Sequence, residues 1–327
     1  MPGLTGIGPS DLKLLRTKGI AHDHVRIAAS GFIARVPRPV QFAAEAGPGY
    51  IRYQAASFAR LAPSGHVPRL IAAIAPSPGL PLGALVIEEI KGRPPRLPDE
   101  LPLIAECLAR IHSLEVPPPS ARPPLIDHAD PAQGTLDVIE RNARSLDAAE
   151  VAGVARRAIA EEIAWARRFA ADANGKDQPA TLVVSDSHPG NFLIDAHGKA
   201  FFIDIEKTIY GSPAIDLAHA VLYTSATWDV DCGIVLEADA IAGFYRDYFA
   251  RIDSRLAQRL KPWLKPMRRL TWLRTTIWAC RFKAEVLDRG GAGDPNSDYV
   301  RHVRARIADF LSPTTIAAIR KEWLTPL

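Results

Sequence analysis

The stretch TLVVSDSHPGNFLID, residues 181–195, places seven polar or turn-forming residues between two apolar runs. Residues 181–184 suit a β-strand, and a second apolar run begins at Phe192. A plain hairpin needs only about two to five loop residues, whereas this loop contains an acid, an imidazole and an amide. The sequence therefore predicts a loop of reactive side chains held between two strands.

A third apolar run, KAFFIDIE at 199–206, follows the turn-like residues DAHG. We expect 181–195 and 199–206 to form one short β-hairpin that brings Asp186, Asn191 and Asp204 to one end. Asn191 and Asp204 offer hard oxygen ligands that suit a phosphate-bound Mg²⁺. Asp186 remains as a carboxylate that can orient a substrate hydroxyl and accept its proton. This combination is typical of phosphoryl transfer, although all three residues could also serve only as turn and cap residues.

Three segments, SDSHPGNFLID (185–195), FFIDIEK (201–207) and GSPAIDLAHA (211–220), together resemble the aminoglycoside phosphotransferase and choline kinase family. The resemblance implies a protein-kinase-like fold with ATP and Mg²⁺ as cofactors. It implies Asp186 as the catalytic base and Asn191 and Asp204 as magnesium ligands that also contact the nucleotide. Asp216 would buttress the loop, or could be only a first-turn acid of a helix. Weaker similarity occurs upstream, in FIARVPR (32–38), VPRLIAA (67–73), LVIEEIKGR (85–93) and CLARIHSL (107–114).

The same resemblance implies a nucleotide site in the first 90 residues. Gly19 would belong to the phosphate-covering loop, and the backbone of Glu88 and Ile90 would bind adenine at a hinge. The sequence has no lysine between residues 18 and 91, so the phosphate-contacting cation must be an arginine, Arg35 or else Arg38. Arginine keeps the charge but presents a planar fork in place of an ammonium group.

The sequence departs from the family pattern around the proposed base. Val184-Ser185 replaces the usual His-Gly, so another group must brace the loop. Gln54 stands where a helix should offer glutamate to the cation, so either Glu45 pairs with Arg35 or phosphate alone holds it. For His188 we favour a loop-structuring hydrogen bond over a catalytic role. These departures leave open an alternative, a pseudokinase-like nucleotide-binding or scaffold protein without turnover.

The order of the predicted elements favours an α+β, two-lobed protein-kinase-like fold. We predict a small, β-rich nucleotide-binding lobe at 1–90 and a larger, mostly helical lobe for catalysis and acceptor binding at 91–327. Strand patterns occur at 24–28, 32–38, 67–75 and 83–90, and helical spacing occurs at 49–62, 97–114, 135–172, 213–224, 234–252, 255–288 and 296–324.

Composition and charge narrow the class of protein. The net charge of +4 does not indicate binding of a polyanion over the whole chain. The three cysteines lie far apart and fit neither a disulfide framework nor a zinc site. Neither a signal peptide nor a membrane span is predicted. We therefore expect a cytoplasmic protein, a monomer or homodimer, and the family resemblance implies that it acts on the hydroxyl of a small molecule.

Residues 251–289 contain eleven Lys and Arg residues against three acids, with Trp263, Trp272 and Trp278 between them. This pattern could form a nucleic-acid surface or a pocket for an anionic acceptor. We favour a helix with an aromatic core stripe and a solvated basic face, and expect no nucleic-acid partner. A strongly cationic aminoglycoside would prefer acidic walls, so we discount it as acceptor. The HDH triplet at 22–24 is expected to form a polar strand face rather than a metal site.

Overall fold

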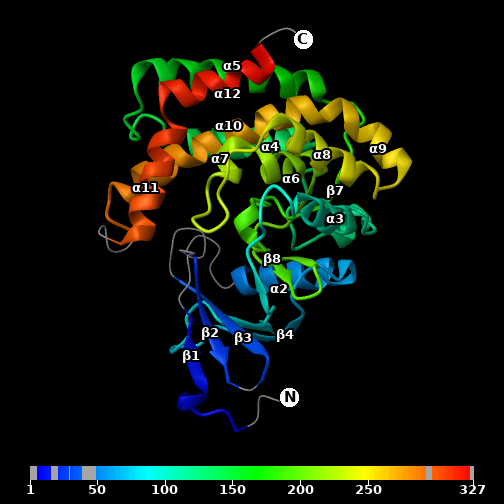
Figure 1. The fold of residues 1–327 in the computed structure, drawn as a ribbon, viewed down its shortest axis with the longest axis vertical. Helices are drawn as coiled ribbons and strands as arrows, with labels where there is room; N and C mark the ends of the chain where they lie inside the picture. The colour runs from blue at the N-terminus through cyan, green and yellow to red at the C-terminus, as the bar shows by residue number, and fades with distance from the viewer. Residues whose placement is uncertain (1–5, 16–20, 29, 39–48, 292–296, 325–327) are drawn as a thin grey trace.

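The computed structural model describes residues 6–15, 21–28, 30–38, 49–291 and 297–324. Its N-terminal part is an antiparallel sheet with strand order β1-β2-β3-β5-β4. Helix α2, Gly49–Leu61, buries Ile51, Phe58 and Leu61 beside this sheet (Figure 1). The strands are β1 Leu12–Leu14, β2 His22–Ile27, β3 Phe32–Pro37, β4 Leu70–Ile74 and β5 Ala84–Glu88.

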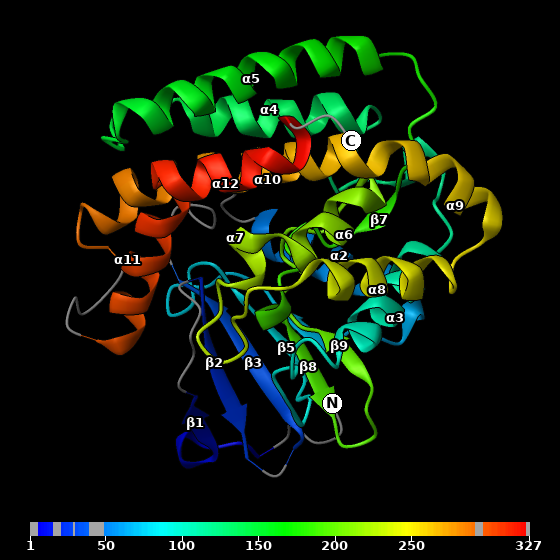
Figure 2. The same ribbon diagram turned by 45° about the horizontal axis from the view of Figure 1, so that its top comes forward.

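Most of the remaining chain is helical, which confirms the predicted α+β class. Helix α10 is central to this part, because it packs against both α4 and α6 and buries Trp272 and Leu273 completely. Helices α4, α5, α10 and α12 gather at the end of the molecule away from the five-stranded sheet (Figures 1 and 2). The helices are α3 Leu101–His112, α4 Pro131–Ala143, α5 Gly153–Ala173, α6 Pro213–Val221, α7 Tyr223–Ala226, α8 Ala238–Phe249, α9 Ser254–Leu260, α10 Leu264–Phe282, α11 Asp298–Phe310 and α12 Pro313–Leu324.

The expected hairpin of 181–195 with 199–206 is confirmed across the DAHG turn, where residues 192–194 pair with 200–202, but it is wrong for the first strand at 181–183. Strand β7, Thr181–Val183, pairs with β10, Ile209–Gly211. Strand β8, Phe192–Asp195, pairs instead with β9, Ala200–Phe202, and with β6, Gly92–Arg93. The loop at 185–191 therefore joins two small sheets. An apolar run predicts a strand but not its partner, and all three residues of β7 are buried, so its pattern carries no facial alternation to guide pairing.

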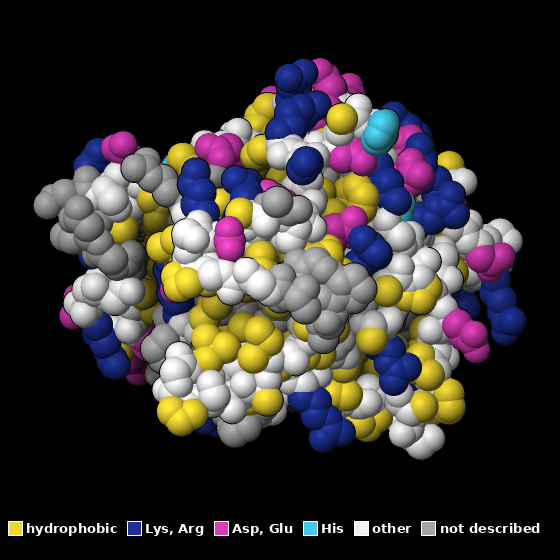
Figure 3. All heavy atoms as spheres, turned by 90° about the horizontal axis from the view of Figure 1, so that it is seen from below, with side chains coloured by type: hydrophobic (Ala, Val, Ile, Leu, Met, Phe, Trp, Pro, Cys, Tyr) yellow, Lys and Arg dark blue, Asp and Glu magenta, His cyan; other side chains and the backbone are white. Residues whose placement is uncertain are grey.

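Several arginines of the basic segment at 251–289 pair with acids from outside it, so the expected solvated face is only partly correct. Arg269 pairs with the fully buried Glu162, Arg268 pairs with Glu322, and Arg259 pairs with Asp177. Figure 3 views the other end of the molecule, that of the five-stranded sheet, where Lys and Arg side chains also lie among acidic and apolar ones. This arrangement gives little support to a nucleic-acid surface, which requires a field of one sign.

Two further expectations can be compared with the described residues. All three cysteines are buried thiols. None of the described helices combines the length and apolarity needed to cross a membrane. The division into lobes at residue 90 stays a prediction, because β6 lies just after that point and pairs with β8 of the second part.

Candidate active site

A cavity of about 1750 Å³ opens between the five-stranded sheet, the loop at 185–191 and helices α4 and α10. The structure brings most of the predicted site residues to its walls. Gly19 lies outside the described residues, and Asp216 is fully buried behind the loop. The predicted residues that line the cavity are Arg35, Glu88, Ile90, Asp186, His188, Asn191 and Asp204.

Backbone bonds within the loop bring Asp186 and Asn191 together. The Asn191 backbone N–H donates to the His188 carbonyl at 2.9 Å, closing a 3₁₀ turn at Pro189–Asn191. The Asn191 side-chain amide donates to the Asp186 carbonyl at 2.8 Å. The Asn191 carbonyl accepts from Ile203 N at 3.0 Å, next to Asp204. Thus the three oxygen-bearing residues meet although the strands pair differently from the prediction.

The Asp186 carboxylate faces two cationic or potentially cationic groups that the sequence analysis missed. Lys207 Nζ lies 2.5 Å from Asp186 Oδ2, and His219 Nε2 lies 3.7 Å from Oδ1. Burial alone would raise the pKa of Asp186, but the Lys207 charge, followed by His188 and His219, lowers it well below its usual range. Asp186 is therefore ionised at neutral pH. Lys207 is the last residue of the segment FFIDIEK, but nothing in the spacing of that segment indicated a role for the lysine.

Arg35 is buried and points to Asp204 rather than to a glutamate of α2. Its Nη2 donates to Asp204 Oδ1 at 2.9 Å, and its Nη1 donates to the Ile203 carbonyl at 3.1 Å. The expectation of a Glu45 pair falls outside the described residues. Gln54 contacts His22 Nε2 at 3.2 Å instead of the arginine. The alternative cation, Arg38, pairs with Asp23, which leaves Arg35 as the arginine held at Asp204.

Behind Arg35 lies a buried polar network that includes His22, the first residue of the HDH triplet. Tyr50 donates to Glu206 at 2.6 Å, and His22 Nδ1 lies 3.2 Å from Arg35 Nη2. Burial, with the Arg35 charge, lowers the pKa of His22 to about 3. Burial and the nearby Asp204 charge raise the pKa of Glu206. His22 is therefore a neutral member of a buried network, and it shares with His24 the polar strand face that lines the cavity, as the alternation predicted.

Asp216 and His112 support the loop from behind. The carboxylate of Asp216 accepts from the backbone N–H groups of Val184 at 2.8 Å and Ser185 at 2.7 Å. His112 Nε2 lies 3.1 Å from the same carboxylate, and both side chains are fully buried. On the open side, Arg274 of α10 contacts Ser185. These groups hold the loop by hydrogen bonds, which the side chain of Val184 cannot form.

The loop-structuring hydrogen bond that we expected from the His188 ring is not found among the described residues. Its Nδ1 is buried without a hydrogen-bond partner in the described part of the chain. Its backbone carbonyl, by contrast, shapes the turn by accepting from Asn191. The ring lies 6.3 Å from that of His219, between centroids.

At the far end of the cavity, the carboxylates of residues 88 and 89 are already engaged in ion pairs. The carboxylate of Glu88 pairs with Arg69 at 3.1 Å, and the Glu89 carboxylate pairs with Arg26 at 2.5 Å. Apolar side chains from both parts of the chain line the nearby walls. They are Ile33, Pro68, Ile87, Leu193 and Ile203.

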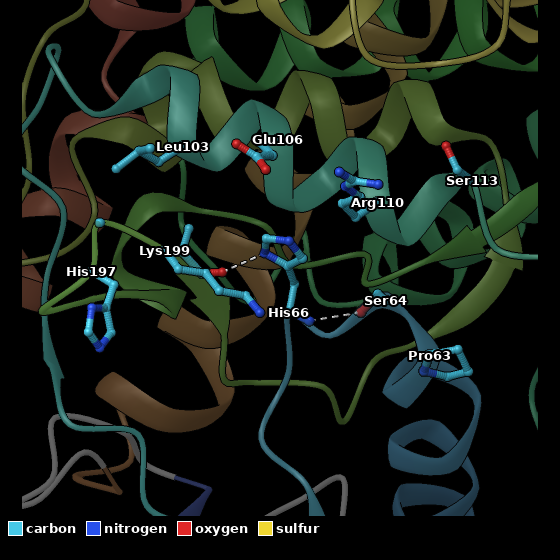
Figure 4. Close-up of a pocket in the computed structure, with 11 residues that line it drawn as sticks. Pro63, Ser64, His66, Leu103, Glu106, Arg110, Ser113, His197 and Lys199 are labelled. Atoms are coloured by element: carbon cyan, nitrogen blue, oxygen red, sulfur yellow. Dashed lines mark hydrogen bonds between the residues drawn. The ribbon is translucent and has the colours of Figure 1, made fainter.

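A smaller cavity, of about 680 Å³, lies between α3 and the turn joining β8 to β9 (Figure 4). His66 is bound there to the Ala200 carbonyl at 2.7 Å. Glu106 and Arg110 come from α3, and Lys199 comes from the turn. None of the predicted site residues lines this cavity, so it is separate from the candidate active site.

Comparison with known proteins agrees with this geometry. A sequence model described as the phosphotransferase enzyme family matches residues 17–263. An ethanolamine kinase structure from Plasmodium vivax is similar at 13% identity and a TM-score of 0.63, covering 96% of this chain and 85% of its own. A choline kinase structure from Streptococcus pneumoniae is similar at 15% identity and a TM-score of 0.58, covering 94% and 93%.

A third structure, an aminoglycoside phosphotransferase from Streptomyces rimosus in complex with ADP and streptomycin, is similar at 17% identity and a TM-score of 0.51. It covers 82% of this chain and 94% of its own. At these identities the structures establish a shared fold alone. The search of curated proteins found no match. Because the family match spans well over half of the 327 residues, the chain belongs to the phosphotransferase enzyme family.

Proposed function

We propose that the chain transfers the γ-phosphate of ATP, with Mg²⁺, to a hydroxyl group of a small molecule. The observation that carries this proposal is the convergence of Asp186, Asn191 and Asp204 on one cavity. Membership of a phosphotransferase family supports the reaction class. The acceptor would enter between α4, α10 and residues 228–231, where the lining includes Trp228, Trp278 and Phe282.

The nucleotide would lie between the two parts of the chain. Its adenine needs apolar contact on both faces and a backbone edge for hydrogen bonds. Ile33 of the first part and Leu193 and Ile203 of the second provide the apolar contacts, and the backbone at Glu88 and Ile90 is the candidate edge. Arg35 and Lys207 are the cations nearest to the expected phosphates.

The donor set at the other end of the cavity fits a magnesium ion. The Asn191 amide nitrogen is used by Asp186, and within the described residues its Oδ1 has no hydrogen-bond partner. Asp204 uses Oδ1 for Arg35 and remains about one-third exposed. Asn191 and Asp204 would therefore hold the ion through oxygen atoms, as Mg²⁺ prefers. Bound there, the ion would neutralise charge on the transferred phosphate.

The electrostatics of Asp186 decide between orientation and strong proton abstraction. A carboxylate with a pKa far below neutral is a weak general base. Phosphoryl transfer passes through a loose transition state that needs orientation more than early proton removal. Asp186 would thus accept a hydrogen bond from the acceptor hydroxyl and hold it in line, taking the proton late. The Lys207 ammonium can shift from Asp186 to the phosphate when substrates enter.

The test is Mg²⁺-dependent ADP release from ATP with a panel of hydroxylated metabolites. Asp186→Asn preserves shape but removes the charge, and should lower kcat by at least about 100-fold while ATP still binds. Asp177→Asn is the matched control, because Asp177 forms its ion pair with Arg259 away from the cavity. Unchanged turnover in Asp186→Asn would refute the proposed mechanism.

One observation favours the second candidate, a nucleotide-binding protein without turnover. Each of the two carboxylates assigned to the reaction already has a cation, Lys207 on Asp186 and Arg35 on Asp204. If these ion pairs persist in the presence of ATP, they block both the hydroxyl and the metal. Calorimetric ATP binding that is equally strong with and without Mg²⁺, with no ADP formed, would support this alternative.

A further inference from the structure

The residue immediately before Asp186 has an unusual backbone conformation. Ser185 has φ of +65°, in the left-handed region. Glycine adopts this region readily, whereas a residue with a Cβ atom adopts it only at a cost. The chain has Ser185 where the related family usually has glycine, so the surrounding structure must hold this conformation.

Two charged groups of opposite sign hold Ser185 from its two sides. The Asp216 carboxylate accepts from Ser185 N at 2.7 Å. Arg274 Nη2 donates to the Ser185 carbonyl at 2.6 Å, and Arg274 Nη1 donates to Ser185 Oγ at 2.8 Å. Every polar atom of this buried residue therefore has a charged partner. Such charge-assisted bonds are stronger than neutral ones.

The planar guanidinium of Arg274 suits this contact, because its fork presents two donors to two oxygen atoms of the same residue. Arg274 also comes from a rigid element. Its neighbours Trp272 and Leu273 are fully buried on α10, and 89 residues separate it from Ser185 in the sequence. These hydrogen bonds therefore fix the loop at Ser185 relative to helix α10.

We propose that Arg274 is a positioning residue, which keeps Ser185 left-handed so that Asp186 faces the cavity. This inference rests on the proposed function, since Asp186 is the group whose placement Arg274 secures. Relaxation of Ser185 to negative φ would rotate the peptide group that joins it to Asp186 and move the carboxylate away from Lys207 and the acceptor.

The test is a double-mutant cycle of Arg274→Met and Ser185→Gly. Arg274→Met should lower kcat about tenfold or more, from the cost of the left-handed conformation, with the KM for ATP nearly unchanged. Ser185→Gly should keep most activity and recover most of the loss when combined with Arg274→Met, because glycine needs no clamp. Arg274→Lys, with a single donor in reach, should be intermediate. Arg268→Met, on the same helix but paired with Glu322 outside the cavity, is the control.

The outcomes separate this inference from the proposed function. An equal loss from Arg274→Met in the parent and in the Ser185→Gly background would mean that the guanidinium acts on a substrate, and would overturn the positioning role. Absence of Mg²⁺-dependent turnover in the parent protein would overturn the proposed function instead. The same four proteins then still test the clamp by denaturant unfolding, in which Arg274→Met must destabilise the parent more than the Ser185→Gly variant. Equal destabilisation refutes it.

Discussion

Substitution of Asp216 by asparagine should destabilise the fold far more than the loss of one surface charge. The side chain is fully buried, and its two oxygens accept from Val184 N, Ser185 N and the ring of His112. Asparagine retains one acceptor oxygen and places an amide NH₂ where the other oxygen was. At least one buried backbone N–H then faces a donor instead of an acceptor.

The magnitude follows from these contacts. A buried donor left without its partner costs about 1–3 kcal/mol, and hydrogen bonds to a charged group contribute about 1.5–3 kcal/mol. With one N–H unpaired and the other bonded to a neutral oxygen, we expect a loss of about 2–4 kcal/mol in the free energy of unfolding. Asp216→Ala, which removes both acceptors and leaves His112 Nε2 without its partner, should cost about 3–5 kcal/mol.

Urea unfolding at constant pH measures this loss as a lower midpoint with an unchanged slope. Asp247→Asn is the matched control, since it removes the same charge from the more exposed i,i+4 pair with Arg251 and should cost less than about 0.5 kcal/mol. If Asp216→Asn unfolds at the same urea concentration as Asp247→Asn, the hydrogen bonds to Val184 and Ser185 do not support the loop as described.

Two other predictions concern charge. Lys207→Met should lower kcat by about 100-fold and move the acid limb of the pH–rate profile upward, because the Lys207 charge that lowers the pKa of Asp186 is lost; an unmoved limb would contradict this. Burial lowers the pKa of both His22 and His219 to about 3, so on acidification the unfolded chain gains protons near pH 6.5 that the folded chain does not. The free energy of unfolding should therefore fall by about 2 kcal/mol per histidine between pH 7.5 and pH 5, and His219→Gln should flatten that fall in urea titrations.

The convergence of the candidate site residues was predictable because they are close in sequence. Asp186, Asn191 and Asp204 lie within nineteen residues of one another, and the turn residues between them force a compact loop. The pattern of alternation and helical spacing likewise predicted the strands β2, β3, β4 and β5 and the helical segments from α2 onward, but it did not separate α9 from α10 or α11 from α12. The partner of β7 was not predictable, because β10 is a three-residue strand that begins beyond the predicted hairpin.

Groups that arrive from distant segments could not be assigned from spacing. Arg274 and Ser185 are 89 residues apart, and Arg35 and Asp204 are 169 residues apart. In both cases the sequence showed only that an expected residue is replaced: Val184 stands in place of a histidine that would hold the loop, and Gln54 in place of a glutamate that would bind the cation. The structure supplies a substitute in three dimensions, with a different residue type from a different element.

These substitutions share a physical consequence for the site. Where a conventional arrangement would pair Arg35 with a glutamate outside the reaction centre, here Arg35 is bound to Asp204 itself. Its charge is therefore available to phosphate only if it leaves or shares that carboxylate, and a divalent ion at Asp204 provides the competing charge. The same reasoning applies to Lys207 and Asp186. Nucleotide and ion should thus bind with strong positive coupling, because an ion at Asp204 frees the Arg35 charge for phosphate, and phosphate draws Arg35 away from the carboxylate that the ion needs.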